Sequence, residues 1–132
     1  MRFIDSNVFI YHMAGDPNYG DKASNILERI ERGEEAAVST LAIAQVCSYL
    51  KWKRRADVIP SFIAFLSSLP NLVKVETTFL DLVEAADLCR EVGWDKWDDV
   101  IIAIQMKKLG VDEIYSNDKD FDQIPSIRRV FD

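Results

Sequence analysis

Short apolar runs alternate with longer amphipathic segments along the whole chain. Runs rich in branched and aromatic residues predict strands, and apolar residues spaced three or four positions apart predict helices. The predicted strands cover residues 1–5, 36–39, 72–76, 113–116 and 128–131. The predicted helices cover residues 6–13, 23–32, 40–50, 57–68, 79–92 and 98–109. This alternation is typical of an α/β domain with a mainly parallel sheet.

Several predicted helices begin with a capping signal. Ser6 or Asn7 is expected to cap the first helix, and Asp98 is expected to cap the last one. Thr78 and Asp81 have the spacing of a capping box. No linker, repeat or low-complexity stretch divides the 132 residues. We therefore expect one domain over residues 1–132, a three-layer sandwich with helices on both faces of a central sheet.

Three aspartates are predicted to meet at one edge of this sheet. Asp5 ends the first strand, Asp118 follows a later strand, and Asp99 lies in the first turn of the helix before that strand. Ligands of open parallel sheets bind outside the C-terminal ends of the strands. Clustered carboxylates repel one another unless a cation neutralises them, and Mg²⁺ and Mn²⁺ favour carboxylate oxygens. Asp5, Asp99 and Asp118 are therefore predicted to bind a divalent ion and to act in catalysis.

Simpler roles are open for some of these acids. Asp5 could cap the helix that follows it, although its neighbours could also do so. In "SNDKDFD" at residues 116–122, Asp120 and Asp122 are interpreted as turn and surface residues. Aspartate is common in turns because its side chain bonds the local backbone.

Composition limits the compartment and the chemistry. The net charge of −6 argues against a general nucleic-acid or membrane-surface coat. Cys47 and Cys89 form no paired motif, and the start carries no leader, so we expect a cytoplasmic protein. The longest uncharged run, 58–73, contains two prolines and is too short to span a bilayer, so no membrane association is expected. His12, the only histidine, is interpreted as an ordinary helix residue, which leaves no basis for a zinc site.

Four segments together resemble the PIN domain family, which includes the toxin nucleases of many prokaryotic toxin–antitoxin pairs. They are "FIDSNVFIY", "STLAIAQVCSYL", "WDDVIIAIQMKKLG" and "IYSNDKDFDQI", and the resemblance covers almost the whole chain. It implies a small α/β fold, ribonuclease activity that depends on Mg²⁺ or Mn²⁺, and frequent dimerisation. It also implies inhibition by a cognate antitoxin where one exists.

The family's acids can be carried over one by one. Asp5 takes the place of the first acid, Asp99 of the third and Asp118 of the fourth. The second acid is normally a glutamate early in the helix after the second strand, and Gln45 stands there instead. Glutamine keeps the shape of glutamate and offers a carbonyl oxygen, but it lacks the negative charge. The resemblance therefore implies a weakened metal site, which Gln45→Glu should strengthen.

Other classes of protein fit less well. A response-regulator receiver domain would need an acidic pair after the first strand, and a haloacid-dehalogenase-type phosphatase would need an aspartate where Asn7 stands. The main alternative is a PIN-like module that binds RNA or a protein without cleaving. Gln45 favours this alternative, and the three retained aspartates oppose it.

Two surface features suggest partners. The cluster "KWKRR", residues 51–55, is the densest basic run in an acidic chain and is predicted to help hold RNA. A solvated helix end or a dimer contact is the alternative. The apolar segment "VIPSFIAFLSSL", together with the family resemblance, predicts a homodimer.

Overall fold

Five short strands form one parallel sheet in the order β3-β2-β1-β4-β5. The computed structural model describes residues 1–132. The strands are β1 (Arg2–Ile4), β2 (Ala36–Ser39), β3 (Leu72–Val75), β4 (Glu113–Tyr115) and β5 (Arg128–Val130). Since all strands run the same way, their C-terminal ends share one edge of the sheet. All five predicted strands are present, close to their expected bounds.

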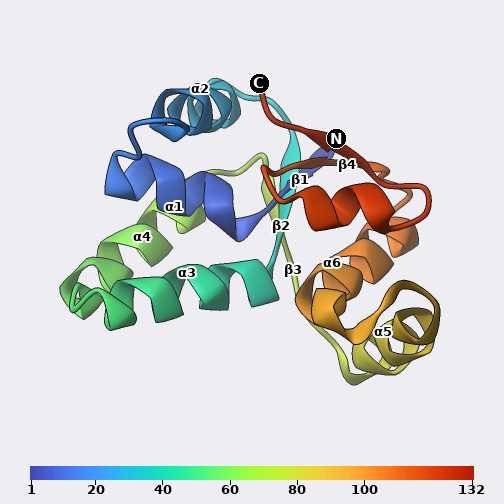
Figure 1. The fold of residues 1–132 in the computed structure, drawn as a ribbon. Helices are drawn as coiled ribbons and strands as arrows, with labels where there is room; N and C mark the ends of the chain where they lie inside the picture. The colour runs from blue at the N-terminus through green and yellow to red at the C-terminus, as the bar shows by residue number, and fades with distance from the viewer.

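Helices cover both faces of this sheet. The helices are α1 (Ser6–Ala14), α2 (Gly20–Glu31), α3 (Thr40–Trp52), α4 (Ile59–Ser67), α5 (Phe79–Val92) and α6 (Trp97–Lys108). In Figure 1 helices α1 to α4 lie on one side of the sheet, and α5 and α6 pack together on the other side. The predicted three-layer α/β sandwich with a parallel sheet is confirmed.

The central strand β1 aligns its two neighbours, β2 and β4, at the C-terminal edge of the sheet. Phe3 pairs with Ala37 of β2 and with Ile114 of β4, and all three side chains are fully buried. Directly after β1, the backbone N–H of Asp5 donates to the carbonyl oxygen of Tyr115 across 2.9 Å. This bond aligns the ends of β1 and β4, so the residues that follow the two strands emerge side by side.

A buried polar network holds α5 against α6. Thr78 and Asp81 form the predicted capping box at the start of α5. Asp81 also accepts a hydrogen bond from Lys108 Nζ across 2.5 Å and one from Gln105 Nε2 across 3.2 Å. Burial raises the pKa of Asp81, but the bonds from Lys108, Thr78 and Gln105 outweigh it and hold the pKa below its ordinary value.

Two predicted caps are wrong. The N-cap of α1 is Asp5, which has an extended backbone and whose side chain accepts the N–H of Ser6, so Ser6 already lies inside the helix. Helix α6 begins at Trp97, and its N-cap, Lys96, makes no side-chain capping bond. A 3₁₀ turn over Trp94–Lys96 leads directly into α6, which places Asp98 within the first helical turn.

Two other helices differ from their predicted bounds. Helix α2 begins at Gly20, before the predicted start at 23. The segment predicted as one helix over 57–68 consists of a 3₁₀ turn, Ala56–Val58, followed by α4 with Pro60 in its first turn. Proline is tolerated there because the first N–H groups of a helix have no partner within it. None of the helices has both the length and the apolar character that crossing a membrane requires.

Candidate metal centre

Asp5 is a buried carboxylate with fixed orientation. The residue is only 4% exposed and lies at the point where β1 passes into α1. The Oδ1 atom accepts a hydrogen bond from the backbone N–H of Ser6 across 2.8 Å, and Oδ2 accepts one from Ser116 Oγ across 2.7 Å. Two donors from different segments thus hold the carboxylate toward the C-terminal edge of the sheet.

Asp118 is tied to Asp5 through the same serine. Its backbone N–H donates to Ser116 Oγ across 2.9 Å, and its Oδ1 accepts from the backbone N–H of Asp120 across 2.9 Å. The second bond caps a short 3₁₀ helix, Lys119–Gln123. The stretch "SNDKDFD" is therefore a turn, and the same turn fixes the position of the Asp118 carboxylate.

Asp99 completes the cluster from a third segment. It lies in the first turn of α6. The next seven residues of this helix, 100–106, are all buried. Carboxylate oxygens of Asp5, Asp99 and Asp118 all lie within 4.8 Å of one another. Residues from the two ends of the sequence thus converge at one point.

Burial and the neighbouring charges raise the pKa values of Asp99 and Asp5. Burial, reinforced by the charges of Asp5 and Asp118, raises the pKa of Asp99 to about 8. Burial also raises the pKa of Asp5, against the hydrogen bonds from Ser116 and Ser6 and with a contribution from Asp118. Three carboxylates this close cannot all be ionised at neutral pH without a neutralising charge.

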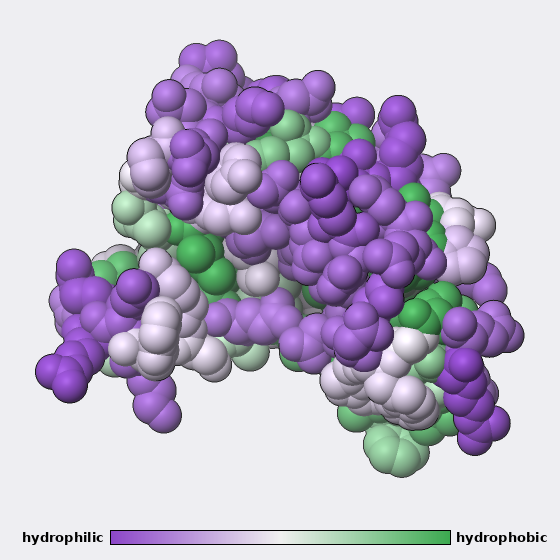
Figure 2. Space-filling model, in the orientation of Figure 1, coloured by the Kyte–Doolittle hydropathy of each residue, from purple (hydrophilic) through white to green (hydrophobic).

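The three aspartates open into a cleft of about 430 Å³, here called the carboxylate cleft. Its lining residues are Asp5, Ser6, Asn7, Gln45, Asp95, Lys96, Trp97, Asp98, Asp99, Asp118 and Asp120. Six aspartates therefore face a single cation, Lys96. Figure 2 shows hydrophilic side chains across the middle of the molecule, with separate apolar patches at the top, at the left and at the lower right.

The acids beyond the central three divide between the cleft and the surface. Asp120, interpreted from the sequence as a turn and surface residue, lines the carboxylate cleft. Asp122 is exposed and pairs with Arg129 across 3.1 Å, as a surface residue would. Gln45 also lines the cleft, and its Nε2 donates to Oδ2 of Asp98 across 2.8 Å.

Sequence reasoning missed Asp95, Lys96 and Trp97. Their only sequence signal is "GWDKWDD", in which a glycine, two tryptophans and a lysine directly precede Asp99. The capping preference of aspartate favours Asp98 as the start of the helix, and the residues before it carry no comparable signal.

The donor set fits a hard divalent cation. Its ligand atoms are carboxylate oxygens, which Mg²⁺ and Mn²⁺ prefer, and no histidine or cysteine lines the cleft. Oδ1 of Asn7, another cleft residue, is buried and has no hydrogen-bond partner. Such an atom is costly unless a ligand or ordered water satisfies it. Asp5, Asp99 and Asp118 are the residues that could hold the ion.

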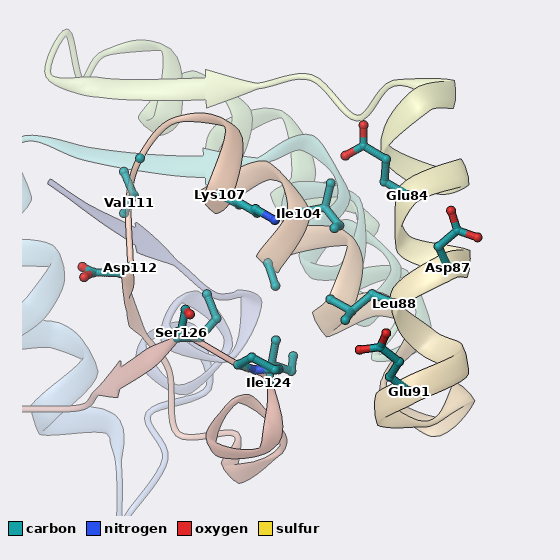
Figure 3. Close-up of a pocket in the computed structure, with 14 residues that line it drawn as sticks. Glu84, Asp87, Leu88, Glu91, Ile104, Lys107, Val111, Asp112, Ile124 and Ser126 are labelled. Carbon is teal, nitrogen blue, oxygen red and sulfur yellow. The ribbon is translucent and has the colours of Figure 1, made fainter.

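A larger groove of about 630 Å³ lies elsewhere, between α5, α6 and the segment before β5 (Figure 3). Leu88, Ile104 and Ile124 line its apolar floor, and Glu84 and Asp87 extend from α5 at its side. No cluster of ligating side chains comparable to the three aspartates occurs there. The cluster of carboxylates thus lies in the smaller, polar cleft and not in this groove.

Comparison with known proteins identifies the family. The sequence matches the PIN domain over residues 2–127, and the chain therefore belongs to the PIN domain family. No curated protein matches the sequence.

Three solved structures are similar in fold. VapC20 from Mycobacterium tuberculosis, a toxin that cleaves the sarcin–ricin loop, superposes with a TM-score of 0.80 at 14% identity, covering 100% of both chains. VapBC2 from Rickettsia felis, bound to a DNA fragment from its promoter, gives 0.72 at 17% identity, covering 99% of this chain and 98% of the other. A toxin–antitoxin complex from Klebsiella pneumoniae gives 0.69 at 20% identity, covering 97% and 96%.

Proposed function

We propose that this protein is a ribonuclease that hydrolyses phosphodiester bonds of RNA with the help of Mg²⁺ or Mn²⁺. The observation that carries the proposal is the convergence of Asp5, Asp99 and Asp118 within 4.8 Å, in a chain of the PIN domain family. The three lie where an open parallel sheet binds its ligands.

Asp5 and Asp99 have separate roles in this proposal. A bound ion would supply a Lewis acid and lower the pKa of a water molecule that attacks the phosphorus. Asp5 is the fixed ligand, because Ser116 and the N–H of Ser6 hold both of its oxygens in place. Asp99, with its pKa raised to about 8, retains its proton near neutral pH and releases it as the cation binds.

We also propose a biological setting as a toxin with a cognate antitoxin. Support comes from the family and from the similar structures, which include a toxin from Mycobacterium tuberculosis and a toxin–antitoxin complex from Klebsiella pneumoniae. Inducing the chain in a bacterial host should arrest growth, and Asp5→Asn should relieve the arrest. Coexpression of a small gene encoded next to it should relieve the arrest as well.

Cleavage of RNA in vitro tests the activity. The parent protein should cut a structured RNA in Mg²⁺ or Mn²⁺ and should stop when EDTA is added. Asp5→Asn, Asp99→Asn and Asp118→Asn should each abolish cleavage. Asp122→Asn is the matched control, because Asp122 is exposed and pairs with Arg129 rather than with the cluster. Equal loss in the control, or EDTA-resistant cleavage that survives Asp5→Asn, would contradict the proposal.

The alternative is a PIN-like module that binds RNA or a protein without cleaving it, and Gln45 is the residue that favours it. Calorimetric titration separates the two. A ribonuclease should bind Mg²⁺ or Mn²⁺ and lose that binding in Asp5→Asn. A non-catalytic module should show the same heats in both proteins and should bind RNA equally well in EDTA.

A further inference from the structure

An aromatic pair stands beside the carboxylate cleft. Trp97 lines the cleft and is half-buried, and Trp94 packs against it with ring centroids 6.0 Å apart and planes inclined by 32°. Trp94 is 59% exposed and adds little to the hydrophobic core. An exposed tryptophan is unusual on the surface of a soluble domain, since its large apolar ring favours burial against a core or a ligand.

A buried lysine accompanies this pair. Lys96 is 6% exposed, and its Nζ lies 3.2 Å and 3.4 Å from the two carboxylate oxygens of Asp95 and 3.3 Å from the carbonyl oxygen of Val92. An ammonium group has three N–H donors, and these three acceptors match them, so the positive charge of Lys96 is fixed in place within the chain. Lys96 is also the only cation among the residues that line the cleft.

The backbone at Gly93 allows this arrangement. Gly93 has a φ of +111°, and a Cβ at this position would lie 2.6 Å from Oδ1 of Asp95. Any other residue would push Asp95 away and loosen its contact with Lys96. The turn at Gly93 thus folds Asp95 and Lys96 together, directly before the helix that carries Asp99.

We propose that Trp94, Trp97 and Lys96 form a subsite for one unpaired nucleotide of an RNA substrate, next to the three aspartates. This inference rests on the proposed ribonuclease function. The base stacks on the aromatic pair, and the positive charge of Lys96 attracts the adjoining phosphate. Stacking suits this position because six aspartates repel the RNA backbone, whereas the face of a base carries no charge. Only an unpaired base exposes its face, so the substrate class is single-stranded RNA or a loop.

Equilibrium binding of a single-stranded RNA of roughly ten nucleotides tests the subsite. Affinity is measured by fluorescence anisotropy of the labelled RNA, in EDTA for every protein and also in Mg²⁺ for proteins carrying Asp5→Asn. Trp94→Ala should weaken binding roughly tenfold, and Trp94→Phe should retain most of the affinity because it keeps an aromatic ring. An RNA that lacks its bases at the bound positions should bind the parent as weakly as it binds Trp94→Ala.

Tryptophan fluorescence gives a second readout. In Trp52→Phe all tryptophan emission comes from Trp94 and Trp97, and RNA should quench it. Trp94→Ala should unfold at the same temperature as the parent, because the side chain is exposed. If the parent binds RNA while Trp94→Ala keeps full affinity and RNA leaves the emission of Trp52→Phe unchanged, the subsite is rejected and the ribonuclease proposal stands. If the parent binds no RNA in any condition and cleaves none, both proposals fail.

Discussion

The side-chain amide of Gln45 donates a hydrogen bond to Oδ2 of Asp98 across 2.8 Å, joining α3 to α6 at the carboxylate cleft. The resemblance to the PIN domain family leads us to expect a glutamate at position 45. A glutamate there would place its carboxylate against that of Asp98 with no proton between them. In this chain the glutamine amide instead holds the Asp98 carboxylate at the cleft. We infer that Asp98 supplies the negative charge that Gln45 lacks.

Exchanging the two side chains tests this inference. Asp98→Asn should weaken Mg²⁺ or Mn²⁺ binding by about tenfold, since one charged ligand or near-ligand contributes on the order of 1–3 kcal/mol. The double variant Gln45→Glu/Asp98→Asn should recover most of that affinity. In the double variant the new amide at position 98 can donate to the new carboxylate at position 45. The cleft then has the same net negative charge as in the parent. Isothermal titration calorimetry measures both affinities.

Gln45→Glu alone completes the cycle. It should tighten ion binding, because a cation neutralises both carboxylates, and it should lower the stability of the ion-free protein, because they repel each other. Affinities that are equal in all four proteins would show that neither residue influences the ion. Recovery absent from the double variant would show that Asp98 acts independently of Gln45.

Asp99 should make the ion-free protein less stable as pH rises. Its pKa is raised to about 8 in the folded state from an ordinary value of 3.8, so the folded protein binds the proton more tightly than the unfolded chain. The resulting stabilisation is fully present below about pH 4 and is lost as pH rises toward 8. Urea midpoints measured in EDTA should therefore fall across this window.

Two comparisons isolate that effect. Asp99→Asn should flatten the decline between about pH 4 and about pH 8, because the amide does not titrate. Mg²⁺ should raise the midpoint most at the alkaline end, where the carboxylates are ionised and ready to bind. A decline equally steep in Asp99→Asn would assign it to other groups.

The convergence of the three aspartates could be predicted because it follows from local signals. Asp5 and Asp118 each follow a strand, and parallel strands end at one edge. Asp99 lies on a helix whose next residues are apolar, which fixes that helix against the sheet. These signals lie within a few residues of each aspartate, so they can be recognised in the sequence without knowing the fold.

The Gln45–Asp98 bond and the position of Lys96 could not be predicted in the same way. Gln45 and Asp98 are separated by 53 positions, and their contact depends on how α3 and α6 are placed across the edge of the sheet. The sequence favours Asp98 as a cap because aspartate is preferred at that position. The 3₁₀ turn before α6 extends the helical backbone to Trp97 and overrides this preference.

Self-association is predicted to involve the start of α5. The apolar segment of α4 buries Phe62 and Leu66 and leaves Ile63 partly exposed, so much of it is used within the fold. Phe79 is 81% exposed and Leu80 is 56% exposed, and such neighbouring apolar side chains mark an interaction surface. Light scattering at micromolar concentration should give a dimer mass for the parent and a monomer mass for Phe79→Glu/Leu80→Glu. Ile63→Glu should remain dimeric, and a monomeric parent would contradict the prediction.

The basic cluster at residues 51–55 is predicted to contact RNA phosphates. It begins in the last turn of α3 and continues just past it, roughly 10 Å along the helix from Gln45 at a rise of about 1.5 Å per residue. Trp52 is 75% exposed, and Lys53 Nζ lies 4.9 Å from the centre of its ring. Replacing Lys51, Lys53, Arg54 and Arg55 by Ala should weaken RNA binding.

The salt dependence distinguishes phosphate contacts from a change in fold. Each lost contact should reduce the slope of log affinity against log salt by about 0.7 for a single strand. Arg32→Ala is the control, because Arg32 is exposed just after helix α2 and pairs with Glu28. An unchanged slope in the fourfold variant would assign the cluster to a solvated helix end.

Asp81 is predicted to be the most sensitive polar position of the fold outside the cleft. Asp81→Ala removes the capping box of α5 and the acceptor to which Gln105 Nε2 donates. We therefore expect the free energy of unfolding, measured in urea, to fall by about 2–3 kcal/mol. The pKa of Asp81 is lowered in the folded state, so its contribution is present above about pH 4 and is lost as pH falls through the folded value. Asp81→Asn should therefore weaken the acid dependence of stability that the parent shows below about pH 4.

Asp122→Asn is the control for this prediction. It removes an exposed ion pair and should change stability by no more than about 0.5 kcal/mol. A similarly small change in Asp81→Ala would mean that α5 and α6 are held by their apolar contacts alone.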